Sequence, residues 1–156
     1  MLLQLTINWQ ALTFSQLNCD QLYELLKLRT DVFVVEQDCA YAELDEKDRH
    51  TQTLHLLGYD QHNQLQAYLR VLPAGISYPA VSIGRVCIAQ TGRGQGLGRA
   101  LIAEGIALVQ QRFGKVDIEI GAQTYLINLY QSFGFNSFSD KYMEDGIEHI
   151  DMRLQA

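Results

Sequence analysis

An α+β fold is predicted for this chain of 156 residues by three observations. Short apolar or alternating runs, typical of β-strands, occur near both ends and in the middle of the chain. Longer stretches between them repeat apolar residues at the spacing of one helix face. A glycine-rich segment, residues 92–98, joins a strand-like run directly to a helix-like run. The length is typical of one domain, residues 1–156, with a core of its own.

The N-terminal part predicts a strand followed by a helix. Leu3–Ile7 alternates larger apolar residues with polar or smaller ones, which predicts the first strand. Asn18 and Gln21, three residues apart, form the pattern of a capping box at a helix start. The apolar residues that follow share one face as far as Phe33, so the helix is expected to continue to that residue.

The middle of the chain predicts three strands. Residues 54–59 and 65–72 are short apolar runs separated by a polar loop, which is the pattern of a hairpin. Residues 81–88 form the third run, in which Gly84 is a candidate bulge. His55 lies inside the first of these strands and is expected to be a packed histidine rather than a catalytic one.

The C-terminal part predicts two helices, another strand and a hairpin. A helix is expected over residues 98–113, where Gly105 on the buried stripe allows close approach to the sheet. Residues 116–120 alternate as a strand does. A short helix is expected from about residue 125 to residue 133. Residues 144–147, Glu-Asp-Gly-Ile, have the composition of a tight hairpin turn before the last strand.

Composition excludes several classes of protein. A net charge of −6 argues against a nucleic-acid binder. No apolar run reaches membrane-spanning length and no signal-peptide pattern is present, so a cytoplasmic protein is expected. Cys19, Cys39 and Cys87 are too few and too scattered for a disulfide framework or a zinc site, and no metal is expected.

The glycine-rich segment has the features of a diphosphate cradle. Glycines at alternate positions from 92 to 98 leave no side chains in the way of backbone N–H groups. A helix starts directly afterwards, so its unpaired N–H groups and positive dipole end face the same point. Arg93 and Arg99 add positive charge. The Rossmann and P-loop spacings both fail here, and a simple glycine-rich helix cap remains the alternative.

Arg93-x-x-Gly96-x-Gly98 resembles the acetyl-CoA loop of the GNAT N-acetyltransferase family, written Q/R-x-x-G-x-G/A. Residues 130–135, Tyr-Gln-Ser-Phe-Gly-Phe, are similar to the family signature in which a helical tyrosine precedes Gly-Phe. Residues 28–37 and the ending at 149–152 resemble the ElaA-like branch of this family. Residues 28–37 also resemble the start of the acyl-homoserine-lactone synthases. The resemblance covers nearly the whole chain.

The resemblance implies a GNAT-type acyl-CoA N-acyltransferase fold, with a central mixed, mainly antiparallel sheet of about six or seven strands and helices on both faces. It implies that acetyl-CoA is the cosubstrate and that an acetyl group passes to a primary amine by direct attack in a ternary complex. The pantetheine arm is expected on the backbone of a strand end, and the diphosphate on the loop. The implied cofactor-binding residues are Val86, Cys87, Ile88, Arg93, Gly94, Gln95, Gly96, Leu97, Gly98, Arg99 and Asn128.

Asn128 is the weakest member of this set, because many family members carry an asparagine where this chain has Tyr125. Tyr130 is the expected proton donor to the leaving thiolate, since a phenol with a pKa near 10 keeps its proton at pH 7. A packing aromatic is the alternative. The base that deprotonates the amine is not specified, and Glu36, Glu119 and His149 are the candidates.

The acidic stretch 38–48 is a further candidate for the acceptor side. Each of its carboxylates, taken alone, is expected in a solvated loop. As a group they are a candidate wall that attracts an amine.

The expected partner is a small-molecule or peptide amine, and a homodimer is possible. Two alternatives stay open: an acyl-homoserine-lactone-synthase-like acyltransferase, and a CoA-binding module without turnover.

Overall fold

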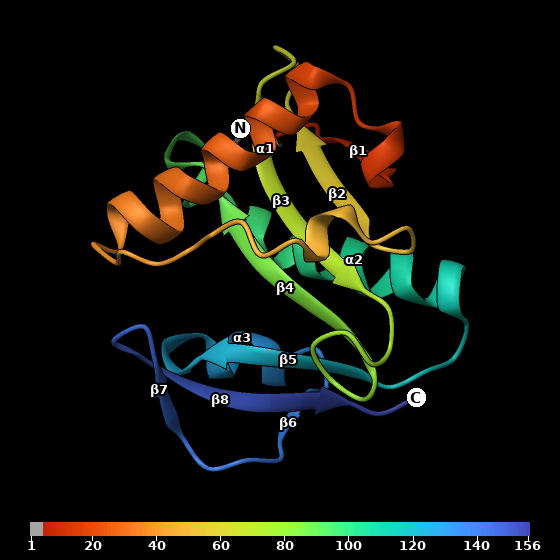
Figure 1. Ribbon diagram of the computed structural model, residues 1–156, viewed down its shortest axis with the longest axis vertical. Coiled ribbons are helices and arrows are strands. Elements are labelled where there is room, and N and C mark those ends of the chain that lie inside the picture. Colours follow the sequence, from red (N-terminus) through yellow and green to blue (C-terminus); the bar gives the residue numbers. More distant parts are fainter. Residues whose placement is uncertain (1–4) are drawn as a thin grey trace.

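The computed structural model describes residues 5–156, which form one mixed eight-stranded sheet (Figure 1). The strands run in the order β1-β2-β3-β4-β5-β8-β6, and β7 pairs with β8. Among these pairings β4 and β5 are parallel and the others antiparallel. The strands are β1 (Asn8–Leu12), β2 (Leu54–Tyr59), β3 (Leu65–Leu72), β4 (Val81–Ile88), β5 (Ile118–Gln123), β6 (Asn136–Ser137), β7 (Tyr142–Glu144) and β8 (Ile147–Leu154). The mixed, mainly antiparallel sheet is therefore confirmed, and the short β6 and β7 raise its strand number to eight.

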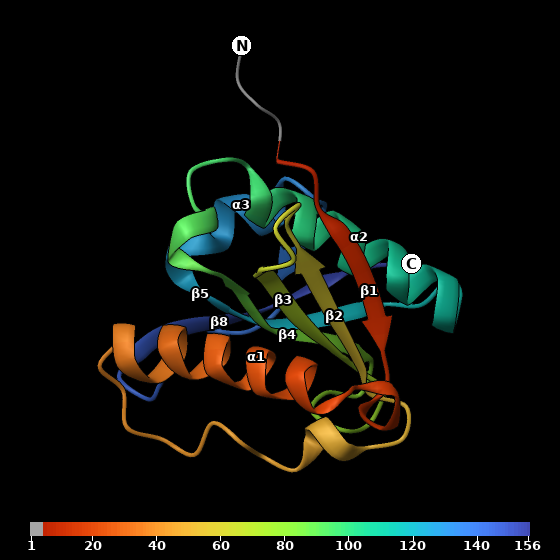
Figure 2. The ribbon, with the colours of Figure 1, turned by 90° about the horizontal axis from the view of Figure 1, so that it is seen from above.

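Helices cover both faces of the sheet, as predicted. Figure 2 shows α1 (Cys19–Thr30) on one side, with α2 (Leu97–Phe113) and α3 (Ile127–Gln131) on the other. Short 3₁₀ turns lie at Phe14–Gln16, Lys47–Arg49, Gln90–Gly92 and Thr124–Leu126. No helix in the described part of the chain is both long and apolar enough to cross a membrane.

The first helix begins as predicted and ends differently. Gln21 donates its N–H to Asn18 Oδ1 at 2.8 Å, and Asn18 donates its N–H to Gln21 Oε1 at 3.0 Å, so the capping box is present. The α-helix ends at Thr30, and the chain continues as a π-helical turn over Asp31–Glu36. Such wide turns are frequent at functional sites, and this one lines the cleft described below.

The predicted first strand is displaced along the chain. β1 starts at Asn8, because its pairing partner β2 ends at Tyr59, opposite that residue. Leu5 and Ile7 precede the strand and pack against the core, so their alternation reflects burial rather than strand pairing. Leu3 lies outside the described residues.

Two apolar clusters lie on opposite faces of the sheet. α2 packs on one face, where a Cβ at Gly105 would lie 2.6 Å from Leu69 Cδ2, so the expected close approach is confirmed. On the other face Leu25 and Leu28 of α1 pack against Leu57 and Tyr68. Both faces are therefore covered over β2, β3 and β4, whereas the second half of the sheet is covered by helices on one face only (Figure 2).

Candidate active site

A cleft opens where β4 and β5 separate. The two parallel strands pair only at Val81–Ile118 and Ser82–Glu119, close to where both strands begin. Beyond Ser82 they diverge, which leaves the backbone of β4 open on the side that faces β5 (Figure 1). The divergence creates a cleft of about 870 Å³.

A β-bulge shapes the open edge of β4. Arg70 lies opposite Gly84 and Tyr68 opposite Cys87, so one residue of β3 faces two residues of β4. Arg85, inside the bulge, has φ +53°, which is left-handed backbone. The sequence indicated a bulge at Gly84, and the structure places it at the next two residues.

The alternation of strand hydrogen bonds identifies which groups of β4 face the gap. Ala89 donates its N–H to the Gln66 carbonyl at 2.8 Å, so residues 87 and 89 pair with β3. The backbone groups of Val86 and Ile88 then point to the opposite, open side. Cys87 itself is buried beneath α1.

The glycine-rich segment lies at one end of the cleft. α2 begins at Leu97, and Gly96 before it has φ +74° and no side chain that caps the helix. A Cβ at Gly94, Gly96 or Gly98 would meet nothing within 4 Å, so the backbone borders open space. The first intrahelical bond at this end is donated by Ala100, so the preceding N–H groups remain available for an anion.

Arg93 connects this loop to the π-helical turn. Its guanidinium pairs with both carboxylate oxygens of Glu36, with Nη2 2.7 Å from Oε2, and its Nε lies 3.3 Å from the Ile88 carbonyl oxygen. The Arg93 guanidinium lowers the pKa of Glu36 below its ordinary value. Glu36 is therefore poorly suited to accept a proton near neutral pH, and its role in this structure is to position Arg93.

The remaining predicted cradle residues lie at the protein surface. Arg99 Nη1 donates to Ser132 Oγ at 3.0 Å and its guanidinium lies over the Phe133 ring, 5.6 Å from the centroid. Gln95 is exposed beside the glycines. Asn128 is exposed on α3 and does not line the cleft, whereas Tyr125 lines its rim and is 72% exposed.

Tyr130 lines the cleft from α3. Its ring is buried and packs edge-on against Phe135, with 5.8 Å between the centroids. Burial raises the pKa of Tyr130 above the ordinary value of a phenol, so the hydroxyl remains protonated at neutral pH. Within residues 5–156 the hydroxyl has no hydrogen-bond partner, which leaves its proton available to a ligand.

His149 lines the cleft from β8. Its Nδ1 lies 2.8 Å from the Ile147 carbonyl oxygen and its ring stacks on Tyr142, with 5.8 Å between the centroids. A carbonyl only accepts hydrogen bonds, so Nδ1 carries the proton and neutral His149 presents a lone pair at Nε2. The Nε2 atom lies 3.9 Å from Glu144 Oε2, across the β7–β8 hairpin.

Glu119, the third candidate base, lies away from the reacting end. The sequence allowed a solvent-facing residue, but its side chain is buried and lies 3.8 Å from Arg153 Nη2. It is opposite Ser82, where β4 and β5 are still paired, and it does not line the cleft. Its position at the closed end of the gap makes it unsuitable as the base.

The acidic stretch 38–48 is not a solvated loop. Glu43 and Asp48 are buried and both bind Arg29, with Glu43 Oε1 2.6 Å from Nε and Asp48 Oδ1 2.7 Å from Nη1. Asp45 binds Arg70 through two oxygens at 2.8 Å each. The expectation of a solvated loop is therefore wrong for these three residues.

Arg85 completes this buried network. Its Nε lies 2.9 Å from Glu43 Oε1 and its Nη2 3.4 Å from Asp45 Oδ2. Although burial opposes the shift, the Arg70 guanidinium lowers the pKa of Asp45 to about 2. Three arginines thus neutralise these three carboxylates, which therefore do not form the expected anionic wall. No sequence signal linked the pairs, because the arginines come from α1, β3 and β4.

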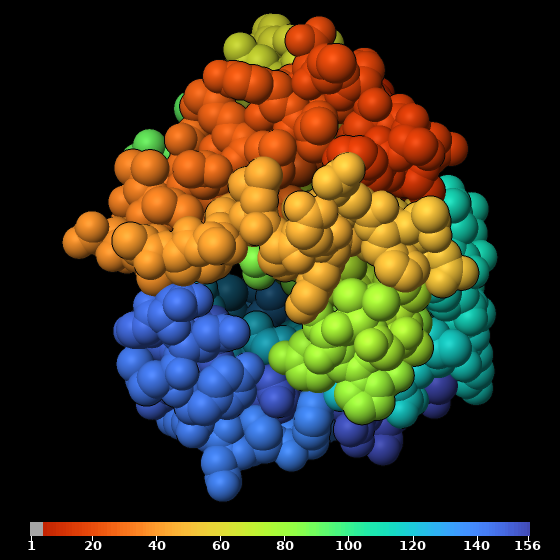
Figure 3. All heavy atoms as spheres, in the orientation of Figure 1, coloured from red at the N-terminus to blue at the C-terminus, as the bar shows by residue number. Residues whose placement is uncertain are grey.

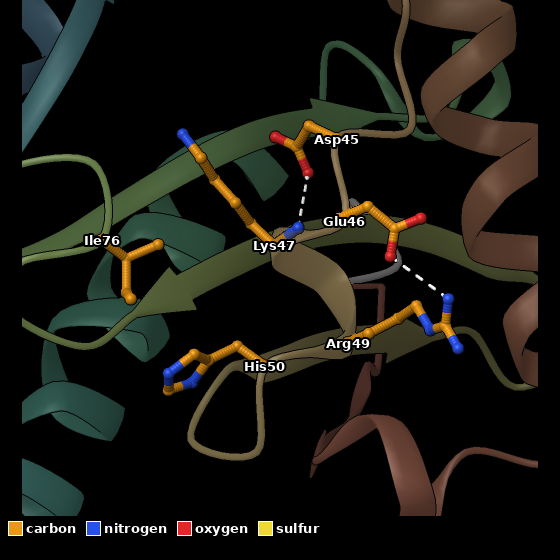
Figure 4. A pocket seen from close by; sticks show the side chains of 6 residues that line it. All are labelled: Asp45, Glu46, Lys47, Arg49, His50 and Ile76. Atoms are coloured by element: carbon orange, nitrogen blue, oxygen red, sulfur yellow. Dashed lines mark hydrogen bonds and ion pairs between the residues drawn. The ribbon is translucent and has the colours of Figure 1, made fainter.

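His55 is packed, as predicted. Its Nδ1 lies 2.7 Å from the Tyr68 hydroxyl and its Nε2 3.0 Å from the Asp48 carbonyl oxygen. A shallow depression of about 550 Å³ lies on the surface next to the network of arginines and carboxylates. Lys47 borders it, and its Nζ points away from the Asp45 carboxylate (Figure 4).

The sequence missed three cleft residues that the fold brings together: Tyr78, Tyr142 and Asp151. They line the part of the cleft that β8 and the β3–β4 loop border. Figure 3 shows a hollow between the stretch 37–48, the β3–β4 loop and the β7–β8 hairpin. The three come from separate segments, and none has a recognisable motif. One sequence signal could have identified Asp151: residues 149 and 151 of a strand lie on the same side, so Asp151 is expected beside the candidate base His149.

The fold and the cleft define the class of this protein. A model of the acetyltransferase (GNAT) domain matches residues 18–156, and the chain belongs to the GNAT family. A domain of this family is an acyltransferase domain and implies an acyl-CoA cosubstrate. Within the family the chain belongs to the ElaA-like branch: it is 40% identical to protein ElaA of Escherichia coli strain K12 over 150 residues, which cover 96% of this chain and 97% of ElaA.

Solved structures agree with this assignment. An acyl-CoA N-acyltransferase from Pseudomonas aeruginosa superposes with a TM-score of 0.91 at 38% identity, covering 97% of this chain and 100% of that one. The crystal structure of E. coli ElaA superposes with a TM-score of 0.88 at 39% identity, covering 95% and 99%. The acyl-homoserine lactone synthase BjaI has a TM-score of 0.78 at 16% identity, covering 95% and 82%, and shares the fold alone.

Proposed function

We propose that the protein transfers an acetyl group from acetyl-CoA to a primary amine, by direct attack of the amine in a ternary complex. The observation that supports this proposal is the cleft between β4 and β5, which opens beside the free N-terminus of α2. The acceptor is a small-molecule or peptide amine that enters the cleft at the end away from the N-terminus of α2.

The residues present fit the cosubstrate. The diphosphate would be held by backbone N–H groups of Gly96, Gly98 and their neighbours, where the helix dipole favours negative charge. The pantetheine amides would pair with the outward-facing backbone of Val86 and with the Ile88 N–H, as an added strand does, since the Ile88 carbonyl oxygen already accepts from Arg93. Arg93, held by Glu36, would add guanidinium hydrogen-bond donors near the diphosphate.

The chemistry needs orientation and proton transfer at the nitrogen and at the sulfur, because the thioester already carries an activated acyl group. His149 Nε2 would take a proton from the ammonium form of the acceptor, which frees the nitrogen lone pair for attack. A carbon–nitrogen bond forms and the carbon–sulfur bond breaks. Tyr130 would donate its phenolic proton to the departing sulfur, which leaves CoA as a thiol. The nitrogen would lose its second proton as the amide forms, and that proton would return through water to the Tyr130 phenolate.

Acetyl-CoA binding is the first test. Gly96→Glu would put a negative side chain in the cradle and strain a backbone at φ +74°, so calorimetry is expected to show loss of acetyl-CoA binding. Gly114→Glu is the matched control: it lies at the other end of α2, has φ +79° and has open space around its Cβ. It should carry at least as much strain, because a ψ of −156° puts Gly114 in a region that is essentially limited to glycine, and it should still bind acetyl-CoA normally. Equal binding by folded Gly96→Glu would reject the cradle.

Turnover is the second test. The wild-type protein, acetyl-CoA and a panel of primary amines should release free thiol with at least one amine. Release with none of them, by a protein that binds acetyl-CoA, would favour the non-catalytic binding module.

A further inference from the structure

The open face of β8 carries a carboxylate that the proposed reaction has not used. Asp151 lies opposite Gly121 of β5, and both residues line the cleft. A Cβ at Gly121 would lie 2.7 Å from the Tyr78 hydroxyl and 3.1 Å from the Tyr142 hydroxyl. The missing side chain of Gly121 is therefore what lets both phenols reach Asp151.

The two tyrosines bind one oxygen of this carboxylate and leave the other uncovered. Tyr78 donates its hydroxyl proton to Asp151 Oδ1 at 2.9 Å, and Tyr142 donates to the same atom at 2.7 Å. Burial, together with Asp151 itself, raises the pKa of Tyr142 to about 12, so this donor keeps its proton at neutral pH. Among the described side chains, Asp151 Oδ2 has no donor and Asp151 has no cationic partner.

This environment differs from that of the other cleft carboxylates near β4. Asp45 lines the same cleft but is bound by Arg70 and Arg85. The cation nearest to Asp151 along its strand, Arg153, lies instead over the Phe138 ring at 4.3 Å and beside Glu119. Asp151 is thus a fixed, half-buried carboxylate that lines the cleft and has one oxygen without a donor among the described side chains.

We propose that Asp151, fixed by Tyr78 and Tyr142, binds the ammonium group of the acceptor and that the acceptor is a small, unbranched alkylamine. This inference rests on the proposed function. A carboxylate with a free oxygen is the side chain that binds an alkylammonium through a charge-assisted hydrogen bond. Asp151 is a binding residue in this proposal, and His149 remains the base.

The shape of the opening supports a narrow acceptor. Gln37 Nε2 lies 3.4 Å from Gln123 Oε1 and Cys39 Sγ 3.0 Å from the Asp145 carbonyl oxygen, so the stretch after the π-helical turn crosses to the other half of the sheet. The β3–β4 loop crosses at Tyr78. Figure 3 shows the hollow enclosed between these segments. An acceptor therefore enters end-on, with its amine first.

The ammonium bound at Asp151 would lie next to the base. His149 and Asp151 are two residues apart on β8 and point to the same face. Tyr142 stacks on the His149 ring and hydrogen-bonds Asp151, so one side chain positions both groups. Proton transfer to His149 Nε2 would convert the bound ammonium to the attacking amine.

Direct amine binding tests this inference without relying on turnover. Calorimetry would titrate 1,5-diaminopentane into the wild-type protein and into Asp151→Asn, each with and without saturating coenzyme A. The asparagine keeps an oxygen for both phenols and removes the charge, so amine affinity is expected to fall about tenfold or more while coenzyme A affinity is unchanged. Asp140→Asn, an exposed carboxylate outside the cleft, is the matched control and should bind like the wild type.

Kinetics separate a binding role from a structural one. With an amine that the wild-type protein acetylates, Asp151→Asn should raise the amine KM more than it lowers kcat. The lost attraction acts on the bound ground state. Tyr142→Phe, which keeps the carboxylate, should raise KM less. Equal diamine affinity in wild-type and Asp151→Asn proteins would overturn the inference, as would the absence of diamine binding to the wild type.

A second set of ligands tests the size of the acceptor. An α-amino acid and a lysine-containing peptide should bind more weakly than the diamine, and tighter Asp151-dependent binding of either would overturn the small-alkylamine assignment. Asp151-dependent diamine binding without acetyl transfer would reject the proposed function and leave the ammonium site standing. Acetyl transfer that is insensitive to Asp151→Asn would overturn the ammonium site at Asp151 and leave the proposed function standing.

Discussion

The two walls of the cleft both carry ionisable side chains, but they are arranged differently. On the α1 side, Glu43, Asp45 and Asp48 are bound by arginines from α1, β3 and β4. On the β8 side, His149 and Asp151 line the cleft, and each has an acceptor atom without a donor among the described residues. The first group is internally satisfied, whereas the second has unused hydrogen-bonding capacity.

The difference distinguishes structural charge from functional charge. A buried ion pair is costly to separate, because removal of one partner leaves the other desolvated and unpaired. A group with a free acceptor atom in a cleft can be altered without that penalty, and it can bind a ligand. Changes on the α1 side are therefore expected to act on folding, and changes on the β8 and α3 side on activity.

The largest expected effect is on stability. Arg29→Met removes the cation shared by Glu43 and Asp48, all three of which are buried. The free energy of unfolding is expected to fall by about 3–5 kcal/mol, the usual cost of breaking a buried pair. Urea unfolding followed by circular dichroism would measure it.

Lys27→Met on the same helix is the control. Its pair with Asp31, at 2.6 Å, is exposed, so solvent screens it and its loss should change the free energy of unfolding far less than Arg29→Met does. A loss below about 1 kcal/mol for Arg29→Met would mean that the network is not a structural unit, and the contrast between the two walls would fail.

The next effect is on turnover. Tyr130→Phe keeps the ring and its edge-on contact with Phe135 and removes a hydroxyl without a partner in the described residues. Stability and acetyl-CoA affinity should change little. The rate of acetyl transfer is expected to fall at least about tenfold, because general acid catalysis typically contributes 10²–10⁴-fold.

Single-turnover measurements are needed for this variant, since amine attack can limit the steady-state rate when thiolate departs easily. Tyr23→Phe on α1, a tyrosine that is 71% exposed, controls for the loss of a phenol. If Tyr130→Phe transfers the acetyl group at the wild-type rate in a single turnover, the tyrosine only packs and does not act as the acid.

The smallest effect is a pH dependence on the α1 side. The pKa of folded Asp45 is about 2, below the unfolded value of about 3.9, so its pairing stabilises the protein above about pH 4. This contribution is lost as the pH falls through about 2. Asp45→Asn should therefore be less stable than the wild type at pH 7, with a difference in Tm that narrows between pH 4 and 2. The Asp140→Asn curve should run parallel to the wild type, and a constant difference for Asp45→Asn would show that charge is not the cause.

The sequence determined the local features of this protein. Three of these features depend on residues within a few positions of one another: the capping box at Asn18, the glycine-rich start of α2 and the hairpin turn at Asp145-Gly146. Asp145 and Gly146 both have positive φ. The order of strands and helices followed from periodicity, and the cofactor loop and the helical tyrosine followed from motifs with short spacing.

Only the tertiary structure decided which charges are paired and which are free. Arg29 binds carboxylates 14 and 19 residues away, and Tyr78 binds one 73 residues away, so local patterning could not connect them. The divergence of β4 from β5 also depends on long-range pairing and on a bulge at Arg85. A carboxylate bound by arginine and one left open to a ligand have the same sequence signature, because pairing is a property of the folded packing.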